Sequence, residues 1–260
     1  MSKPLLHYYN ISSEVVAFST TRHGGKSKGT FGTLNINAYR GDDSIAVEAN
    51  LEAVAKEINV PKERIIRQHQ VHGTDSRIIA EEFFLLPTEV KKQILEGSDA
   101  LLTDVQGVCI GVHTADCVPV LLYDTVHHAA AAIHAGWRGT VKHIVRKTIY
   151  SMMNVYNTAP KYLKAVIGPC ISLKNFEVGQ EVYNQFAEAN FDMDKVSKFY
   201  EKWHINLPLA NEYELLSLGV KPNNIFQSGI CTYDNYEDYF SARRIKENFG
   251  TIYTGIILKK

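Results

Sequence analysis

The sequence predicts an α+β protein in which 260 residues form one domain with mixed or antiparallel β-sheets. Three apolar segments, at residues 107–113, 118–124 and 128–133, indicate buried strands with short connections. Segments with helical apolar spacing occur both before and after these strands. Strands and helices do not alternate regularly, so a parallel sheet built of βαβ units is not expected.

The N-terminal part of the chain predicts a strand, a loop and a helix. Residues 14–21 alternate and are rich in β-branched side chains, which favours a strand. Residues 22–29 follow as a glycine-rich loop. Residues 44–58 carry apolar side chains mostly at helical spacing, and Asp42 or Asp43 would cap that helix.

The part of the chain after the central strands predicts more helix. Residues 124–127 resemble a hairpin turn between the second and third strands. After Gly139, apolar side chains recur at i, i+3, i+4 and i+7 over residues 141–152, which indicates a helix. Downstream we expect a strand at 163–168, helices at 179–189 and 208–218, and a closing strand at 250–258.

Composition excludes several classes of protein. Lys+Arg and Asp+Glu balance at 28 each, so no net field draws the molecule to nucleic acid or to an anionic membrane. No apolar run approaches the roughly 18 residues of a membrane span, and the N-terminus has no secretory apolar core. We therefore expect a cytoplasmic protein with four reduced cysteines and no obligatory protein partner.

Three residues in the middle of the chain, His72, Cys117 and His134, are the strongest candidates for chemistry. They stand in the short motifs Gln-Val-His-Gly, Thr-Ala-Asp-Cys and His-Ala-Gly-Trp-Arg-Gly, at the ends of expected strands. Two imidazoles and one thiolate can hold zinc with its fourth position open, as a catalytic site requires. Separations of 45 and 17 residues match no zinc finger, so these ligands would converge through the fold.

Less specific interpretations of these residues stay open. Seven of the ten histidines fall between residues 69 and 143, and a lone histidine is usually a surface or core residue. An intracellular cysteine is most often a buried, inert thiol. That interpretation suits Cys109, inside an apolar strand, and also Cys170 and Cys231, which have no histidine beside them.

Two arginines and an aspartate are further candidate catalytic residues. Arg138 precedes a helix, where it and the helix N–H groups could bind phosphate, or it could pair with a carboxylate in a tight turn. Arg40 could bind a phosphate bidentately or lie on the surface. Asp116 could orient a ligand histidine or act as a base, or it could form an Asx turn.

Several blocks of this sequence together resemble one bacterial family. They are Gln70–Gly73, Asp99–Thr103, Thr114–Leu122, His134–Gly139, Gly168–Pro169, Phe176–Gly179 and Cys231–Thr232. From about residue 15 to its end, the chain resembles the family first described as laccase-like polyphenol oxidases. The family is now described as zinc-dependent purine nucleoside phosphorylase with adenosine deaminase activity, and is also called the YfiH or peptidoglycan-editing-factor family.

The resemblance implies a single domain of layered mixed β-sheets flanked by helices, with the metal site at strand ends. It implies zinc held by His72, Cys117 and His134, with copper less favoured. The implied reaction is phosphorolysis of adenosine, inosine or S-methyl-5′-thioadenosine to the free base and ribose 1-phosphate, with adenosine deamination. Purine nucleosides and phosphate are then the partners. Ala242 and Thr251 depart from the family pattern, which has Tyr and Arg there.

Three other functions stay open. Cys117 could be the nucleophile of a hydrolase or deamidase, with His134 or His72 as its base. A copper-dependent polyphenol oxidase would need many more histidine ligands than two. A role in editing peptidoglycan precursors has no motif in the sequence to support it.

Overall fold

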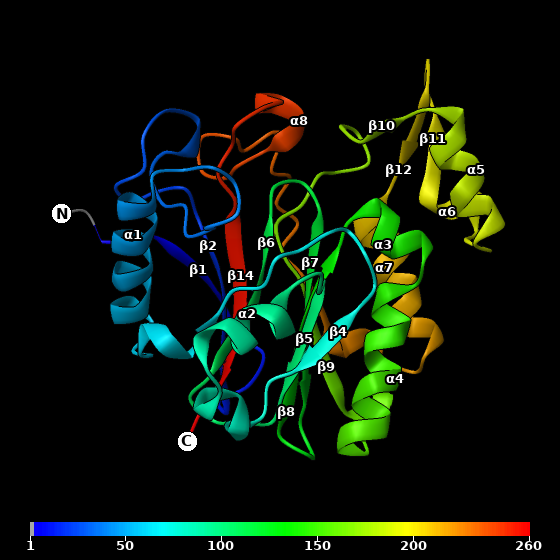
Figure 1. The fold of residues 1–260 in the computed structure, drawn as a ribbon. Helices are drawn as coiled ribbons and strands as arrows, with labels where there is room; N and C mark the ends of the chain where they lie inside the picture. The colour runs from blue at the N-terminus through cyan, green and yellow to red at the C-terminus, as the bar shows by residue number, and fades with distance from the viewer. Residues whose placement is uncertain (1–2) are drawn as a thin grey trace.

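Two β-sheets packed face to face between layers of helices form the centre of the structure (Figure 1). The computed structural model describes residues 3–260. This arrangement confirms the expected α+β class with layered mixed sheets. The expected single domain over 1–260 stays a prediction, and Met1 and Ser2 lie outside the described residues.

The first sheet has five strands in the order β1-β2-β14-β6-β3. All neighbours are antiparallel except β3 and β6, which run parallel. The strands are β1 Leu6–Tyr9, β2 Val15–Thr20, β14 Ile252–Leu258, β6 Cys109–Thr114 and β3 Ile65–Ile66. The closing strand therefore lies in the middle of this sheet, between β2 and β6.

The second sheet has six strands in the order β13-β9-β7-β8-β5-β4. Its four inner strands pair antiparallel, and the edge strands β13 and β4 each run parallel to their neighbour. The strands are β13 Ile225–Gln227, β9 Leu163–Ile167, β7 Val118–Asp124, β8 Ala129–Ala135, β5 Ala100–Thr103 and β4 Ser76–Ile78. The expected turn at 124–127 joins β7 to β8 as a hairpin.

A small antiparallel sheet of three strands stands apart at the upper right of Figure 1. Its strands are β10 Glu177–Val178, β12 Trp203–Ile205 and β11 Ser197–Phe199. The helices α5 Gln180–Glu188 and α6 Met193–Val196 lie beside it.

Alternation along the strands explains the layers, because successive side chains point to opposite faces of a sheet. In β7, Leu121 faces the first sheet, where it packs with Ile110 of β6 and Ile256 of β14. Its neighbours Val120 and Leu122 face the other way and pack with helical residues such as Val145. Both sheets are thus buried on two faces, which accounts for their nearly continuous apolar sequences.

Eight α-helices occur within residues 3–260. Those not yet described are α1 Ser44–Glu57, α2 Thr88–Leu95, α3 Trp137–Val141, α4 Ile144–Tyr156, α7 Leu207–Ser217 and α8 Ala242–Ile245. Short 3₁₀ helices lie at Gly29–Phe31, Lys62–Arg64, Glu81–Leu85, Pro160–Tyr162 and Pro222–Asn224. The α1 helix packs Leu51 and Val54 against the first sheet, and the side chain of Asp43 caps it, as expected.

One expectation about the helices needs correction. The helix expected over 141–152 is two helices, because His143 has a left-handed backbone (φ 59°) that cannot continue an α-helix. The strands β6 and β7 are close in sequence but belong to different sheets. The turn between them therefore crosses from one sheet to the other, and this crossing carries Cys117.

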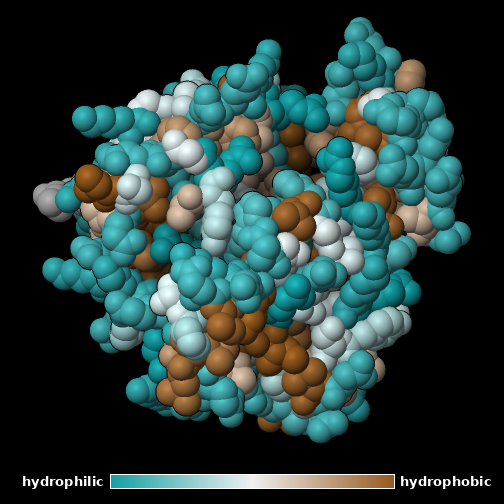
Figure 2. Space-filling model, in the orientation of Figure 1, coloured by the Kyte–Doolittle hydropathy of each residue, from teal (hydrophilic) through white to brown (hydrophobic). Residues whose placement is uncertain are grey.

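No helix among residues 3–260 has the length and apolar character that crossing a membrane requires. On the face shown in Figure 2, hydrophilic side chains cover most of the surface, and apolar side chains gather low on that face, near α2. Leu85, which is 85% exposed, precedes that helix.

Leu121 offers a test of the packing between the sheets. The change Leu121→Ala should lower the free energy of unfolding by about 2–5 kcal/mol, because the side chain is fully buried and its loss leaves a cavity. Urea denaturation measures the effect. The exposed control Leu85→Ala should stay within about 0.5 kcal/mol of the parent protein. Equal effects of the two changes would contradict the layered arrangement.

Candidate metal centre

Neighbouring strands place Cys117 and His134 at the same end of the second sheet. β7 begins directly after Cys117, and His134 lies at the end of β8 opposite Pro119. Antiparallel pairing brings the start of one strand beside the end of the other. His72 comes from a separate segment, the loop that leads from β3 to β4.

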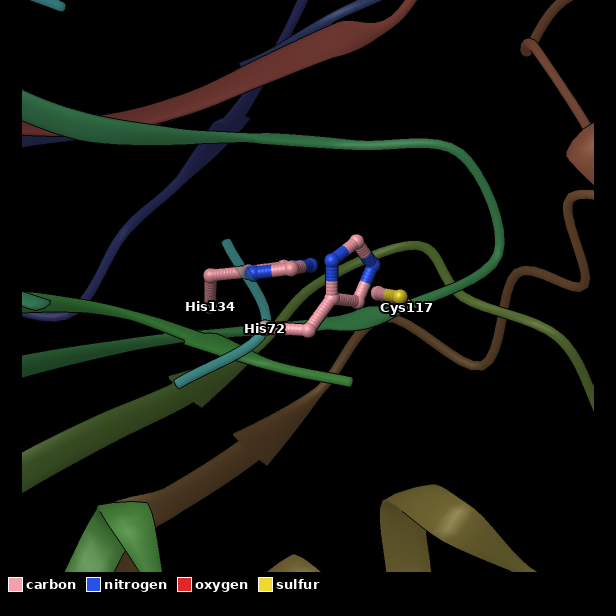
Figure 3. A group of neighbouring side chains, drawn as sticks. All are labelled: His72, Cys117 and His134. Atoms are coloured by element: carbon pink, nitrogen blue, oxygen red, sulfur yellow. The ribbon is translucent and has the colours of Figure 1, made fainter. Parts of the chain in front are cut away.

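The structure brings the three expected ligands together. One ligand atom from each of His72, Cys117 and His134 lies within 4.8 Å of the other two (Figure 3). The two imidazole rings meet edge to face, with their centroids 4.7 Å apart. His134 is buried, Cys117 is half-buried and His72 is exposed, so the group opens to solvent on one side. Within residues 3–260, it is the one group of three or more such side chains near enough to share an ion.

Asp99, the residue before β5, holds two of these ligands in place. Its Oδ1 accepts a hydrogen bond from Nδ1 of His134 at 2.6 Å, so Nε2 is the ring nitrogen that could bind a metal once it has lost its proton. The same carboxylate accepts the backbone N–H groups of Val71, His72 and Gly73 at 3.2, 3.0 and 2.7 Å. One buried carboxylate therefore fixes the ring of one ligand and the loop of another.

Two backbone features give the ligands room and direction. His72 has a left-handed backbone (φ 60°), which turns the loop at the ligand. A Cβ atom added to Gly136 would lie 3.0 Å from Cys117 Sγ and 3.1 Å from His72 Cδ2. Position 136 therefore needs glycine because the ligands pass directly over its backbone.

The charges at the site favour a thiolate. Burial alone would raise the pKa of the Cys117 thiol, but the charge of His134 and hydrogen bonds from His134 and His72 outweigh burial and lower it to about 6. Burial disfavours the charged form of His134, yet the Cys117 thiolate and Asp99 raise its pKa to about 9. A thiolate beside two imidazoles is the form in which cysteine binds metal or attacks an electrophile.

A cavity of about 210 Å³ opens beside the three ligands. It is small against the roughly 300–1,000 Å³ of typical ligand sites, which suits a small molecule rather than a polymer. Arg40 lines it, and the guanidinium lies 4.2 Å from the ring centroid of Phe249. Ala242 and Thr251, the two positions that depart from the family pattern, also line the cavity. Because position 251 is threonine where the family pattern has arginine, Arg40 is the one lysine or arginine among the lining residues that the structure describes.

The other two candidate residues lie outside this cavity. Arg138 is exposed and stacks on the ring of Trp137, with its guanidinium carbon 4.3 Å from the ring centroid. The helix α3 does begin at Trp137, as the sequence indicated, but it has only five residues. Arg138 is not among the residues that line the cavity beside the three candidate ligands, and its phosphate-binding role stays a prediction.

Asp116 contacts the C-terminal segment instead of a ligand histidine. Its two carboxylate oxygens accept hydrogen bonds from the Thr232 hydroxyl and from the backbone N–H of Arg243, both at 2.6 Å. Asp116 thereby ties the turn that carries Cys117 to residues 232–243. The partner of the ligand His134 is Asp99, which the sequence showed only as the first residue of a family-like block.

The fold and the site together define the class: an α+β protein with a His-Cys-His group at the mouth of a small cavity. The chain belongs to the family described as multi-copper polyphenol oxidoreductase laccase, whose sequence model matches residues 16–259. That match covers nearly all of the described chain and includes every residue of the group.

Similar proteins carry names of purine enzymes. The chain is 40% identical to a purine nucleoside phosphorylase of Bacteroides thetaiotaomicron, over 99% of this chain and 97% of the relative. It is 36% identical to adenosine deaminase RL5 of an unknown prokaryotic organism, over 94% of each chain. The crystal structure of YlmD from Geobacillus stearothermophilus superposes with a TM-score of 0.88 at 28% identity, covering 97% of this chain and 94% of YlmD.

The Cys117 thiol should titrate far below an ordinary cysteine in the metal-free protein. We expect its ultraviolet thiolate absorbance to rise with a midpoint near pH 6, because the two histidines stabilise the anion. The same change in Cys117→Ser protein should be absent. Since protons compete with metal for its ligands, metal affinity should fall as the pH drops below about 9, where His134 gains a proton, and more steeply below about 6. A midpoint near 9, the ordinary value, would contradict this account.

Loss of the Asp99 charge should weaken metal binding. The change Asp99→Asn should lower zinc affinity by roughly 10- to 100-fold, the usual effect of removing a group that orients a metal-binding histidine. Competition with a chromophoric chelator measures the affinity, and thermal unfolding reports whether the variant is folded. The exposed aspartate Asp104 supplies the control Asp104→Asn. A folded Asp99→Asn protein with unchanged zinc affinity would remove Asp99 from the site.

Proposed function

We propose that this protein is a zinc-dependent purine nucleoside phosphorylase that splits adenosine, inosine or S-methyl-5′-thioadenosine into a free base and ribose 1-phosphate, and that it also deaminates adenosine. The observation that carries the proposal is the His72–Cys117–His134 group at the mouth of a small cavity. The names of the similar proteins support the same chemistry.

The residues at the site suit zinc. Two imidazoles and one thiolate, with one side left open, form the ligand set of a catalytic zinc ion. Asp99 supplies the carboxylate that commonly binds the second nitrogen of a zinc-bound histidine. When bound, zinc would supply Lewis-acid chemistry, polarising the purine or lowering the pKa of a water molecule.

Arg40 is our candidate for binding the phosphate nucleophile. It is the cation that lines the cavity, and a guanidinium can bind two phosphate oxygens at once. Phe249 packs against its guanidinium and limits its movement. Arg138 and Asp116 would act more remotely: Asp116 positions the Cys117 turn, and Arg138 would contribute charge outside the cavity.

Product analysis tests this proposal. The zinc-loaded protein should form ribose 1-phosphate from inosine only when phosphate is added. The change Cys117→Ser should reduce both zinc content and turnover, whereas Cys231→Ser should keep both, because Cys231 lies in a different cavity. Zinc-loaded protein that forms no ribose 1-phosphate at any phosphate concentration would refute the phosphorylase assignment.

One observation favours a second candidate, a cysteine hydrolase or deamidase. Cys117, His134 and Asp99 are linked in the order of a nucleophile, a base and an orienting carboxylate. Thiol alkylation and metal chelation, applied separately, distinguish the two functions. A hydrolase would be inactivated by alkylation and unaffected by chelation, while the zinc enzyme would lose activity on chelation.

A further inference from the structure

Several residues that line the cavity carry buried polar atoms that have no hydrogen-bond partner within residues 3–260. Residues 3–260 contain nine such side-chain atoms, and four of them belong to residues that line this cavity: Nε2 and Oε1 of Gln68, Nε2 of His113 and Oγ1 of Thr114. Gln68 is only 1% exposed, and Thr114 is 2% exposed. Each unpartnered buried polar group costs stability, so such a cluster points to a ligand that completes the hydrogen bonds.

A chain of hydrogen bonds fixes which nitrogen of the His113 ring carries the hydrogen. Asn35 Nδ2 donates to Asp42 at 2.9 Å, so Oδ1 of Asn35 is an acceptor. The hydroxyl of Thr251 donates to that oxygen, at 3.4 Å. The oxygen of Thr251 must then accept from Nδ1–H of His113, at 3.2 Å, since otherwise two acceptors would face each other. Nε2 of His113 therefore carries a lone pair and needs a donor from the ligand.

The unpartnered groups select the kind of ligand. They are an amide, a neutral imidazole and a hydroxyl, and the unpartnered Nε2 of the imidazole can only accept. A phosphate or carboxylate offers acceptors, and it would repel the His113 lone pair. A purine base offers N–H donors and ring acceptors side by side along one edge, and a glutamine amide pairs with such an edge through one donor and one acceptor.

We propose that Gln68 and His113 form the base-recognition end of the cavity. Gln68 pairs with the group at purine position 6, and Nε2 of His113 accepts the neighbouring N–H, which is N1–H in inosine and the second amino hydrogen in adenosine. Because the amide can rotate by half a turn, Gln68 matches both the amino group of adenosine and the oxo group of inosine. This assignment rests on the proposed function, since it takes a purine nucleoside as the ligand of the site.

Nucleoside analogues with the zinc-loaded protein test the assignment. The parent protein should bind inosine about 10- to 100-fold more tightly than purine riboside, which lacks the group at position 6. Gln68→Met should bring that ratio close to one and leave the ratio of inosine to 2′-deoxyinosine unchanged. Titration calorimetry without phosphate measures the ratios, and the exposed Gln106→Met is the matched control. The melting temperature of Gln68→Met should not fall, because the native amide has no partner to lose.

Three results would overturn the assignment. If Gln68→Met keeps the preference for inosine over purine riboside, Gln68 does not read position 6. If it removes only the preference for inosine over 2′-deoxyinosine, Gln68 holds the ribose. If the parent protein binds none of these nucleosides, the proposed function itself fails, and the base assignment falls with it.

Discussion

The buried carboxylate of Asp99 is the constraint on which the candidate site depends. It is fully buried, and it accepts hydrogen bonds from His134 Nδ1 and from three successive backbone N–H groups of the loop that carries His72. A charge away from water is tolerated only when it is paired and hydrogen-bonded. Movement of either ligand would leave part of this carboxylate unpaired, so the two ligands are held in one arrangement before any ion arrives.

The layered fold brings the rest of the site to the same place. The chain passes from the first sheet to the second at residues 115–117, which puts Cys117 where the two sheets meet. His113 and Thr114 reach the cavity from the end of β6, and His134 reaches it from the end of β8. These three lining residues are therefore held by strands, a placement that favours a precise geometry, whereas most of the other lining residues come from loops. Arg40 comes from a loop, and the ring of Phe249 packs against its guanidinium.

The sequence predicted those parts of the structure that local patterns encode. Long buried strands such as β7 show as continuous apolar runs, the capped helix α1 shows helical spacing, and the three candidate ligands were recognisable from residue type and motif. Strands of two to four residues, such as β3 and β4, are too short to show a period. The helix break at His143 depends on a left-handed backbone that histidine does not signal. Asp99 was not assigned a role because its partner His134 is 35 residues away.

X-ray absorption spectroscopy of the zinc-loaded protein tests the central claim most directly. The account predicts one zinc per chain, bound by one sulfur and two imidazole nitrogens, with a fourth light-atom ligand that exchanges with solvent. The Cys117→Ser protein should lose the sulfur contribution. A zinc ion with two or more sulfur ligands, or with no sulfur at all, would contradict the site described for His72, Cys117 and His134.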